Sequence, residues 1–195
     1  MPELGYIGRM PCAPTDIIPI YTSMSVLPAN TFDFFSHSSE QTRNLGMRLG
    51  AHLQAGDVIC LQGELGAGKT TFVQGVAAGW GSLDAVSSPT FVLVNVYRRA
   101  DGGQLFHFDT YRLESAPEAE ELDLDAMLSS GPLVIEWPER MAGVLPAERL
   151  WVKLDYVVPD SGQNDDDQRQ LRFLPSGEHY INLLNEFRRS GFGTE

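Results

Sequence analysis

Apolar residues recur at helical spacing in several parts of the chain. The first such stretch covers about 39–54, where leucines return every fourth position and Ser38 with Gln41 has the spacing of a capping box. An acidic stretch that opens at Pro117 places its carboxylates where a helix dipole favours them. The pattern therefore predicts helices over about 39–54, 70–79, 117–129 and 178–188.

Short apolar runs and turn residues predict the strands. Residues 57–61 and 133–135 are brief apolar runs that are typical of buried strands. Two strand-like pairs flank polar turns and predict β-hairpins. They are 91–99 with 105–108 around Ala100-Asp101-Gly102-Gly103, and 150–158 with 170–174 around 161–167. Strands that alternate with helices in this way indicate an α/β fold with a mixed, mainly parallel sheet.

A glycine-rich loop carries the strongest chemical signal. Gly63-Glu64-Leu65-Gly66-Ala67-Gly68-Lys69-Thr70 matches the pattern G-x-x-x-x-G-K-[ST] between a predicted strand and a predicted helix. Glycines let several backbone N–H groups approach phosphate oxygens, and the helix that follows presents the positive end of its dipole. Lys69 can bridge the β- and γ-phosphates, and Thr70 can give its hydroxyl oxygen to Mg²⁺. The loop predicts ATP and Mg²⁺ as ligands and a three-layer sandwich like that of P-loop NTPases.

Two carboxylates follow predicted strands and can face this loop. Glu136 ends the run Leu133-Val134-Ile135, and Asp109 ends the run 105–108. Because the ends of parallel strands gather beside a phosphate loop, we expect both carboxylates near the phosphates. We assign Glu136 to the metal, and Asp109 to a place near the γ-phosphate where it orients Mg²⁺ or the attacking water. Two alternatives remain open: an exchange of these roles between Glu136 and Asp109, and the interpretation of either residue as a solvated acid at the end of its strand.

Two further residues near these acids have a structural alternative. His107 lies on an apolar strand and is interpreted as a hydrogen-bonded core histidine rather than a ligand or base. Trp137 directly follows Glu136 and either packs on the nucleotide base or a neighbouring segment, or belongs to the core.

Charge is distributed unevenly along the 195 residues. The net charge is −12; residues 1–100 carry six basic and seven acidic side chains, whereas residues 101–195 carry eight and nineteen, a net of −11. A protein that grips nucleic acid by itself normally has a basic face, so any nucleic acid in its pathway is expected to be held by a partner.

Composition also bounds the domain organisation and compartment. Residues 1–30 contain five prolines and are expected to form a flexible N-terminal extension, and 31–195 a single domain. The two cysteines, Cys12 and Cys60, suggest neither a disulfide framework nor a zinc site. No stretch reaches the roughly 18 apolar residues that a membrane helix needs. These features favour a cytoplasmic protein that does not enter a membrane.

Several signatures of other nucleotide-binding classes are missing from the sequence. There is no Asn-Lys-x-Asp for guanine selection, no arginine-rich lid segment of a small-molecule kinase and no ABC-type signature. No arginine finger is evident either, and such a finger can contribute about 10³–10⁵ in rate. Slow intrinsic ATP hydrolysis is therefore expected.

Four sequence blocks resemble the TsaE (YjeE) family, the bacterial ATPases of tRNA threonylcarbamoyladenosine formation. The blocks are residues 63–71, Ser88-Pro89-Thr90, residues 107–113 and Glu136-Trp137-Pro138, and the likeness covers about residues 37–160. The resemblance implies slow hydrolysis of ATP with Mg²⁺. It also implies docking on a complex of the TsaD and TsaB proteins, with tRNA met only through these partners.

The resemblance also implies roles for individual residues. Lys69, Asp109 and Glu136 are the expected catalytic residues, and Thr70, Glu136 and Asp109 the expected metal-side residues. Thr71 continues the loop towards the α-phosphate, and Thr90 lies in a switch-like segment. The expected nucleotide contacts are Glu64, Leu65, Gly66, Ala67, Gly68, Lys69, Thr70, Thr71, Thr90 and Trp137.

Three functional hypotheses follow from these observations. The first is a slow ATPase that serves tRNA threonylcarbamoylation. The second is a P-loop kinase that phosphorylates a small molecule or a protein, against which the missing lid argues. The third is a non-catalytic module whose bound ATP only sets its affinity for a partner.

Overall fold

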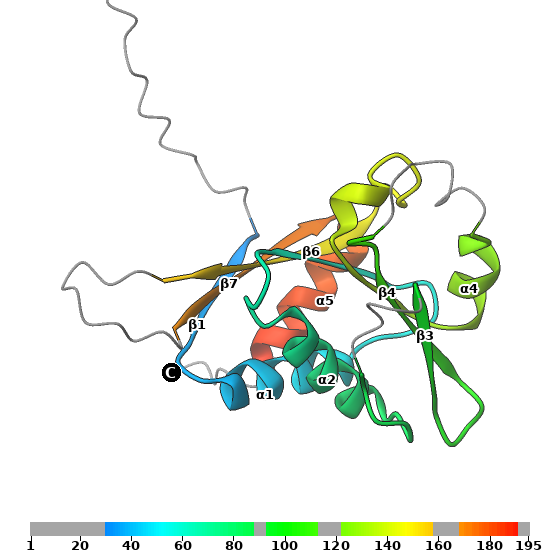
Figure 1. Cartoon of the computed structure of the whole chain (residues 1–195), viewed down its shortest axis with the longest axis horizontal. Helices are drawn as coiled ribbons and strands as arrows, with labels where there is room; N and C mark the ends of the chain where they lie inside the picture. Colours follow the sequence, from blue (N-terminus) through cyan, green and yellow to red (C-terminus); the bar gives the residue numbers. More distant parts are fainter. Residues whose placement is uncertain (1–29, 88–92, 113–121, 158–167, 191–195) are drawn as a thin grey trace, which may run out of the picture.

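A computed structural model describes residues 30–87, 93–112, 122–157 and 168–190 of the chain. These residues form a mixed sheet with helices on both faces (Figure 1). The strands are β1 (Phe32–Ser36), β2 (Val58–Gly63), β3 (Val94–Arg98), β4 (Gln104–Asp109), β5 (Leu133–Glu136), β6 (Arg149–Tyr156) and β7 (Arg169–Ser176). The helices are α1 (Ser39–Gly50), α2 (Lys69–Trp80), α4 (Leu124–Ser130), the 3₁₀ helix η1 (Pro138–Met141) and α5 (Glu178–Arg189).

The sheet has a parallel centre and antiparallel edges. Its seven strands lie in the order β1-β7-β6-β2-β5-β4-β3. Strands β6, β2, β5 and β4 run parallel to one another, while β3 pairs antiparallel with β4, and β7 pairs antiparallel with both β6 and β1. The β2 strand, which leads into the glycine-rich loop, is therefore central. The mixed sheet and both hairpins are confirmed, although only three of the six strand pairings among the described residues are parallel rather than most of them.

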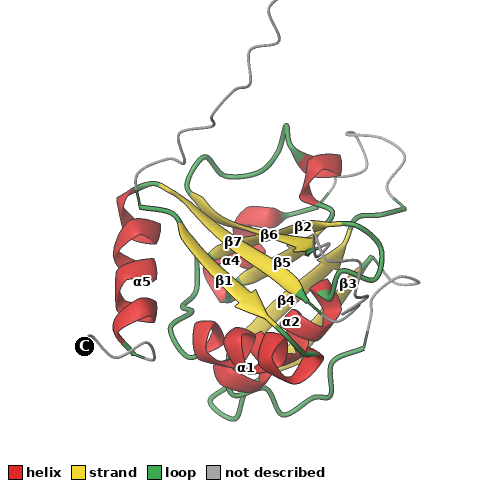
Figure 2. Cartoon of the chain, turned by 90° about the vertical axis from the view of Figure 1, so that its left-hand side faces the viewer, coloured by secondary structure: helices red, strands yellow, loops and turns green. Residues whose placement is uncertain are grey.

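Alternating side chains of the central strands build two cores, one on each face of the sheet. On β2, Ile59 and Leu61 pack with α1, α2 and α5, whereas Val58 and Cys60 pack with residues around α4 and η1. All four are buried, as expected for a parallel strand covered on both faces. Figure 2 shows α1 and α2 together on one side of the sheet, with α5 beside them. The three-layer α/β arrangement that the sequence predicts is confirmed.

Glycines allow α1 and α2 to approach backbone to backbone. A Cβ atom at Gly75 would lie 2.0 Å from the carbonyl oxygen of Arg43, and one at Gly79 would lie 1.7 Å from that of Met47. Gly46 on α1 has the same restriction, because its Cβ would lie 2.3 Å from the carbonyl oxygen of Phe72. This contact holds α2, and with it the end of the glycine-rich loop, against the rest of the domain.

We expect the substitution Gly79→Ala to lower the free energy of unfolding by about 2 kcal/mol. Overpacking typically costs about 1–3 kcal/mol, and the clash here is with backbone that cannot rotate away, although alanine improves helix propensity by up to about 1 kcal/mol. Urea denaturation measures the difference. Gly143→Ala is the matched control, since no atom lies within 4 Å of its added Cβ. Equal free energies of unfolding for the two variants would contradict the close backbone contact between α1 and α2.

Several predicted elements differ from the observed ones. The first helix ends at Gly50 rather than near 54, because the N–H groups of His52 and Leu53 bond three residues back to Leu49 and Gly50. An unbroken helix over 117–129 is wrong, since residues 122–123 are not helical and Asp123 caps α4 at Leu124 by accepting a hydrogen bond from the N–H of Ala126. Residues 117–121 lie outside the described ranges. The sequence did not predict β1.

Some expectations fall on residues outside the described ranges. These are the N-terminal extension up to residue 29, the 161–167 turn and the Ser88-Pro89-Thr90 segment, including the expected contact of Thr90. In the part of the chain that is described, no helix combines the length and hydropathy needed to cross a bilayer.

Candidate nucleotide-binding site

The glycine-rich loop has a backbone that glycine adopts more readily than other residues at three positions. Gly66 has a φ of 81°, and Gly68, the N-cap of α2, has a φ of 102°. Gly63 has a φ of 157°, and it also lacks space for a side chain, because an added Cβ would lie 2.4 Å from the carbonyl oxygen of Leu154 on β6. The loop thus turns tightly from β2 into α2 and leaves the first N–H groups of α2 directed at its concave side.

The ammonium group of Lys69 lies at the mouth of the loop. Its Nζ donates hydrogen bonds to the carbonyl oxygens of Gly63 at 2.8 Å and Glu64 at 2.9 Å, and lies 3.9 Å from the centre of the Trp137 ring. Burial lowers the pKa of Lys69, and the carboxylates of Glu136 and Asp109 oppose this shift. A buried positive charge is therefore held beside two acids, in a place suited to phosphate oxygens.

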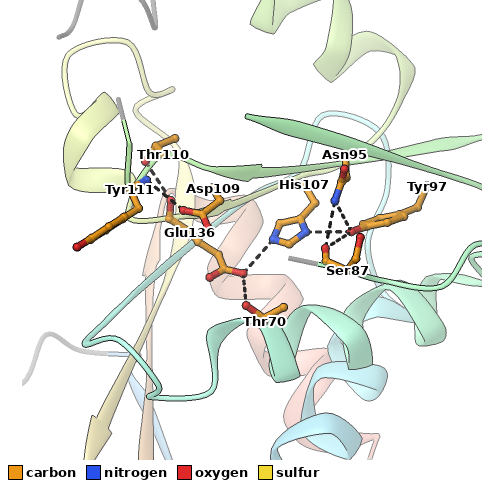
Figure 3. A network of polar contacts seen from close by, with 9 residues as sticks. All are labelled: Thr70, Ser87, Asn95, Tyr97, His107, Asp109, Thr110, Tyr111 and Glu136. Atoms are coloured by element: carbon orange, nitrogen blue, oxygen red, sulfur yellow. Dashed lines mark hydrogen bonds and ion pairs between the residues drawn. The ribbon is translucent and has the colours of Figure 1, made fainter. Parts of the chain in front are cut away.

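The two predicted acids end adjacent parallel strands. Asp109 on β4 and Glu136 on β5 are partners in the strand register, and both are buried, with 7% and 3% of their surface exposed. The hydroxyl of Thr70 donates a hydrogen bond to Oε1 of Glu136 at 2.9 Å (Figure 3). Asp109 accepts a hydrogen bond from the N–H of Tyr111 at 3.0 Å. The expected gathering of both carboxylates beside the loop is observed.

Hydrogen bonds from Thr110 fix the turn that follows Glu136. Trp137 has a left-handed backbone with a φ of 60°, uncommon for a residue other than glycine. The hydroxyl of Thr110 donates to the carbonyl oxygens of Trp137 at 2.6 Å and Glu136 at 3.0 Å, and Thr110 is fully buried. The Trp137 ring, whose centre lies 5.1 Å from that of Tyr111, is thereby held over Lys69.

A cavity of about 420 Å³ joins these groups. Its lining combines loop residues, both acids and two aromatic rings: Leu65, Gly66, Gly68, Lys69, Thr70, Thr71, Asp109, Tyr111, Glu136 and Trp137. Among the predicted contacts, Ala67 is buried and can offer only backbone, and Glu64 lines a neighbouring cavity of about 740 Å³ instead. A third cavity of about 120 Å³ continues along the loop past Thr71 to Arg169.

The residues present suit Mg²⁺ held together with phosphates rather than by protein alone. Within the described ranges there is no group of three or more His, Cys, Asp or Glu side chains that could form a metal site. Mg²⁺ prefers oxygen ligands and commonly takes one or two carboxylates together with substrate phosphates. The Thr70 hydroxyl with Glu136 and Asp109 provides this kind of oxygen set at the head of the loop.

His107 is the core histidine that its position predicted, but its partner belongs to the site. It is fully buried, and its Nε2 lies 3.0 Å from Oε1 of Glu136 while its Nδ1 lies 3.1 Å from the hydroxyl of Tyr97. One sequence feature indicated that His107 lies near the site. His107 and Asp109 are two residues apart on one strand, so their side chains share a face of the sheet. No feature of the sequence indicated that Tyr97 contributes to this contact.

A central strand, a glycine-rich loop, a helix and two strand-end acids in this arrangement define a P-loop NTPase-like α/β protein. Comparison with known proteins identifies the family. Residues 36–164 match the model of the family described as "Threonylcarbamoyl adenosine biosynthesis protein TsaE". The chain belongs to the TsaE family.

Individual relatives agree with this assignment. The chain is 43% identical over 140 residues to the tRNA threonylcarbamoyladenosine biosynthesis protein TsaE of Streptomyces coelicolor, covering 71% of this chain and 93% of that protein. It is 38% identical over 152 residues to the Bacillus subtilis protein of the same name, covering 77% and 89%. The crystal structure of Bacillus subtilis YdiB superposes with a TM-score of 0.66 at 30% identity, covering 82% of this chain and 95% of that one.

Proposed function

We propose that this chain is an ATPase that binds Mg²⁺ and ATP at the loop 63–70 and hydrolyses ATP slowly. In this proposal it serves the threonylcarbamoyl modification of a tRNA adenosine, as the name of its family indicates. It acts on a complex of TsaD and TsaB type, which carries out the transfer and holds the tRNA.

One observation carries the nucleotide part of the proposal: the hydrogen bond from Thr70 to Glu136 at the head of the glycine-rich loop. In P-loop proteins the loop threonine or serine binds Mg²⁺ through its oxygen while an acid from a neighbouring strand supports it. Here the Thr70 hydrogen already points at the carboxylate, 2.9 Å away, which leaves the oxygen lone pairs for a cation. A glycine-rich turn that binds no phosphate or metal would not require the Thr70 hydroxyl and the Glu136 carboxylate at this position.

Each group then has a distinct task. The backbone N–H groups of the loop and the start of α2 bind the phosphate oxygens, and Lys69 neutralises charge between the β- and γ-phosphates. Mg²⁺, held by Thr70 and Glu136, would neutralise further charge on the same phosphates. Asp109, one strand further along, orients the attacking water towards the γ-phosphate; an exchange of roles between the two acids is tested below.

Slow turnover without a partner fits the charges around the cavity. Lys69 is the one cationic side chain among the described residues that line it. Arginine fingers supplied by a second protein can raise the rate of related enzymes by about 10³–10⁵. A partner that completes the site is therefore expected to stimulate hydrolysis.

The overall charge supports an indirect relation to tRNA. A net charge of −12, with −11 in residues 101–195, disfavours binding to a polyanion and suits a basic protein surface. This supports a division of labour in which the partner complex holds the tRNA.

Phosphate release with and without a purified TsaD–TsaB complex tests the proposal. We expect weak release from the chain alone and a rise of at least tenfold when the complex is added. The tRNA of a bacterium depleted of its own TsaE should regain threonylcarbamoyladenosine when this chain is expressed. ATP-dependent docking without turnover would instead indicate a sensing module, and transfer of phosphate to an acceptor other than water would indicate a kinase.

A further inference from the structure

A line of hydrogen bonds runs behind the metal-side acid, away from the cavity (Figure 3). From Oε1 of Glu136 it passes to His107 at 3.0 Å and on to the hydroxyl of Tyr97 at 3.1 Å. It ends at Asn95 and Ser87: the carbonyl oxygen of Ser87 lies 3.1 Å from the Tyr97 hydroxyl and 3.1 Å from the side-chain amide of Asn95, which itself lies 3.4 Å from that hydroxyl. Asn95 and Tyr97 lie on β3, His107 on β4 and Glu136 on β5, so three strands take part.

The carboxylate end of the line fixes the direction of its first hydrogen bond. A carboxylate only accepts hydrogen bonds, so Nε2 of His107 carries the proton that reaches Glu136. The Tyr97 hydroxyl has one hydrogen and two acceptors within reach, Nδ1 of His107 at 3.1 Å and the carbonyl oxygen of Ser87 at 3.1 Å, and it can donate to Nδ1 when the imidazole is neutral. The carbonyl of Ser87 still receives a hydrogen bond from Asn95, and burial raises the pKa of Tyr97, which keeps its hydroxyl protonated. Every group in the line has a partner of the right kind.

From this geometry we infer that His107 and Tyr97 are positioning residues that hold the Glu136 carboxylate in the orientation needed to support Mg²⁺. The inference rests on the proposed function. Two donors, Thr70 from the cavity side and His107 from the opposite side, meet on the same oxygen, Oε1. This pair of contacts prevents rotation of the carboxylate about its last bond.

Such supporting groups have measurable effects. Hydrogen-bond partners behind metal ligands typically contribute about 10–100-fold in metal affinity or activity. His107 is fully buried and does not line the cavity, so its loss should reach the nucleotide only through Glu136. The expected signature is a loss of the Mg²⁺-dependent part of nucleotide binding with no change in the Mg²⁺-independent part.

Calorimetric titration with ADP, once with excess Mg²⁺ and once with EDTA, tests the inference in the full chain. For His107→Phe, which keeps a flat ring without its hydrogen bonds, the gain in affinity that Mg²⁺ provides should fall by about tenfold or more. Tyr97→Phe keeps its ring, and the gain in affinity that Mg²⁺ provides should fall by about threefold. In EDTA both variants should bind ADP within twofold of the unsubstituted chain.

Rescue and control variants separate positioning from a general loss of structure. His107→Gln can still donate from its side-chain amide and should recover the Mg²⁺ effect to within about threefold. Tyr180→Phe removes another buried hydroxyl, which accepts a hydrogen bond from the N–H of Val58 at 2.6 Å, and should leave the Mg²⁺ effect unchanged.

The outcomes distinguish the inference from the function on which it rests. An unchanged Mg²⁺ effect in Tyr97→Phe and His107→Phe, in a chain that binds Mg²⁺ and ADP normally, would overturn the inference and leave the proposed function standing. Equal losses with Mg²⁺ and with EDTA, or an equal loss in Tyr180→Phe, would also overturn it. No binding of ADP by the unsubstituted chain would overturn the proposed function itself.

Discussion

Substitution of Lys69 by alanine is expected to lower the affinity for ATP by about 100-fold or more. Lys69 is buried, with its ammonium at the mouth of the loop, where it can contact both terminal phosphates. Hydrogen bonds to charged groups contribute about 1.5–3 kcal/mol each, and every 1.4 kcal/mol corresponds to a factor of ten. Two such contacts therefore account for the expected loss, which isothermal titration calorimetry with ATP and Mg²⁺ can measure.

The second lysine of the chain provides the control. Lys153 lies on β6 beside the neighbouring cavity, and Lys153→Ala removes the same charge without touching the loop cavity. It should bind ATP within about threefold of the unsubstituted chain. Near-normal binding by Lys69→Ala would refute the assignment of the loop.

Substitution of Glu136 by glutamine is expected to reduce Mg²⁺-dependent phosphate release by about 100-fold. The amide keeps the size of the side chain and can still accept the hydrogen bond of Thr70, but it lacks the charge that supports the cation. Losses at groups that ligate or support a metal are typically about 10–100-fold, and the loop contacts to the phosphates remain. Affinity for ATP measured in EDTA should therefore stay within about threefold, while the gain in affinity that Mg²⁺ provides should fall by about tenfold or more. Parallel measurement of turnover and binding separates the two effects.

Glu139→Gln makes the same chemical change three residues further on. Glu139 is exposed on η1 and does not line the loop cavity, so turnover should stay within twofold of normal. Unchanged turnover in Glu136→Gln would mean that the metal-side acid is misassigned. Asp109→Asn then tests the exchanged roles, since Asp109 is the register partner of Glu136 on β4.

The glycine-rich loop was predictable because its requirements are local. Close backbone approach and left-handed angles select glycine at fixed spacing, and the structure places these angles at Gly66 and Gly68. The meeting of Asp109 and Glu136 was predictable for a related reason. Each acid directly follows an apolar strand, and parallel strands bring their ends to one edge of the sheet.

Features that depend on distant parts of the chain were not predictable from the pattern. The β1 strand is short and forms by pairing with β7, so Phe32 lies beside Phe173 although the two are far apart in sequence. The start of α4 at Leu124 depends on a single capping side chain, Asp123, inside an acidic run. His107 could be placed in the core, but its contact with Glu136 required the register of two neighbouring strands.

A crystal structure with Mg²⁺ and a non-hydrolysable ATP analogue tests the central claim most directly. We expect the triphosphate to lie against the loop 63–70, with Lys69 between its β- and γ-phosphates and Mg²⁺ beside Thr70 and Glu136. A nucleotide bound elsewhere on the chain, with this loop free of phosphate, would contradict the account.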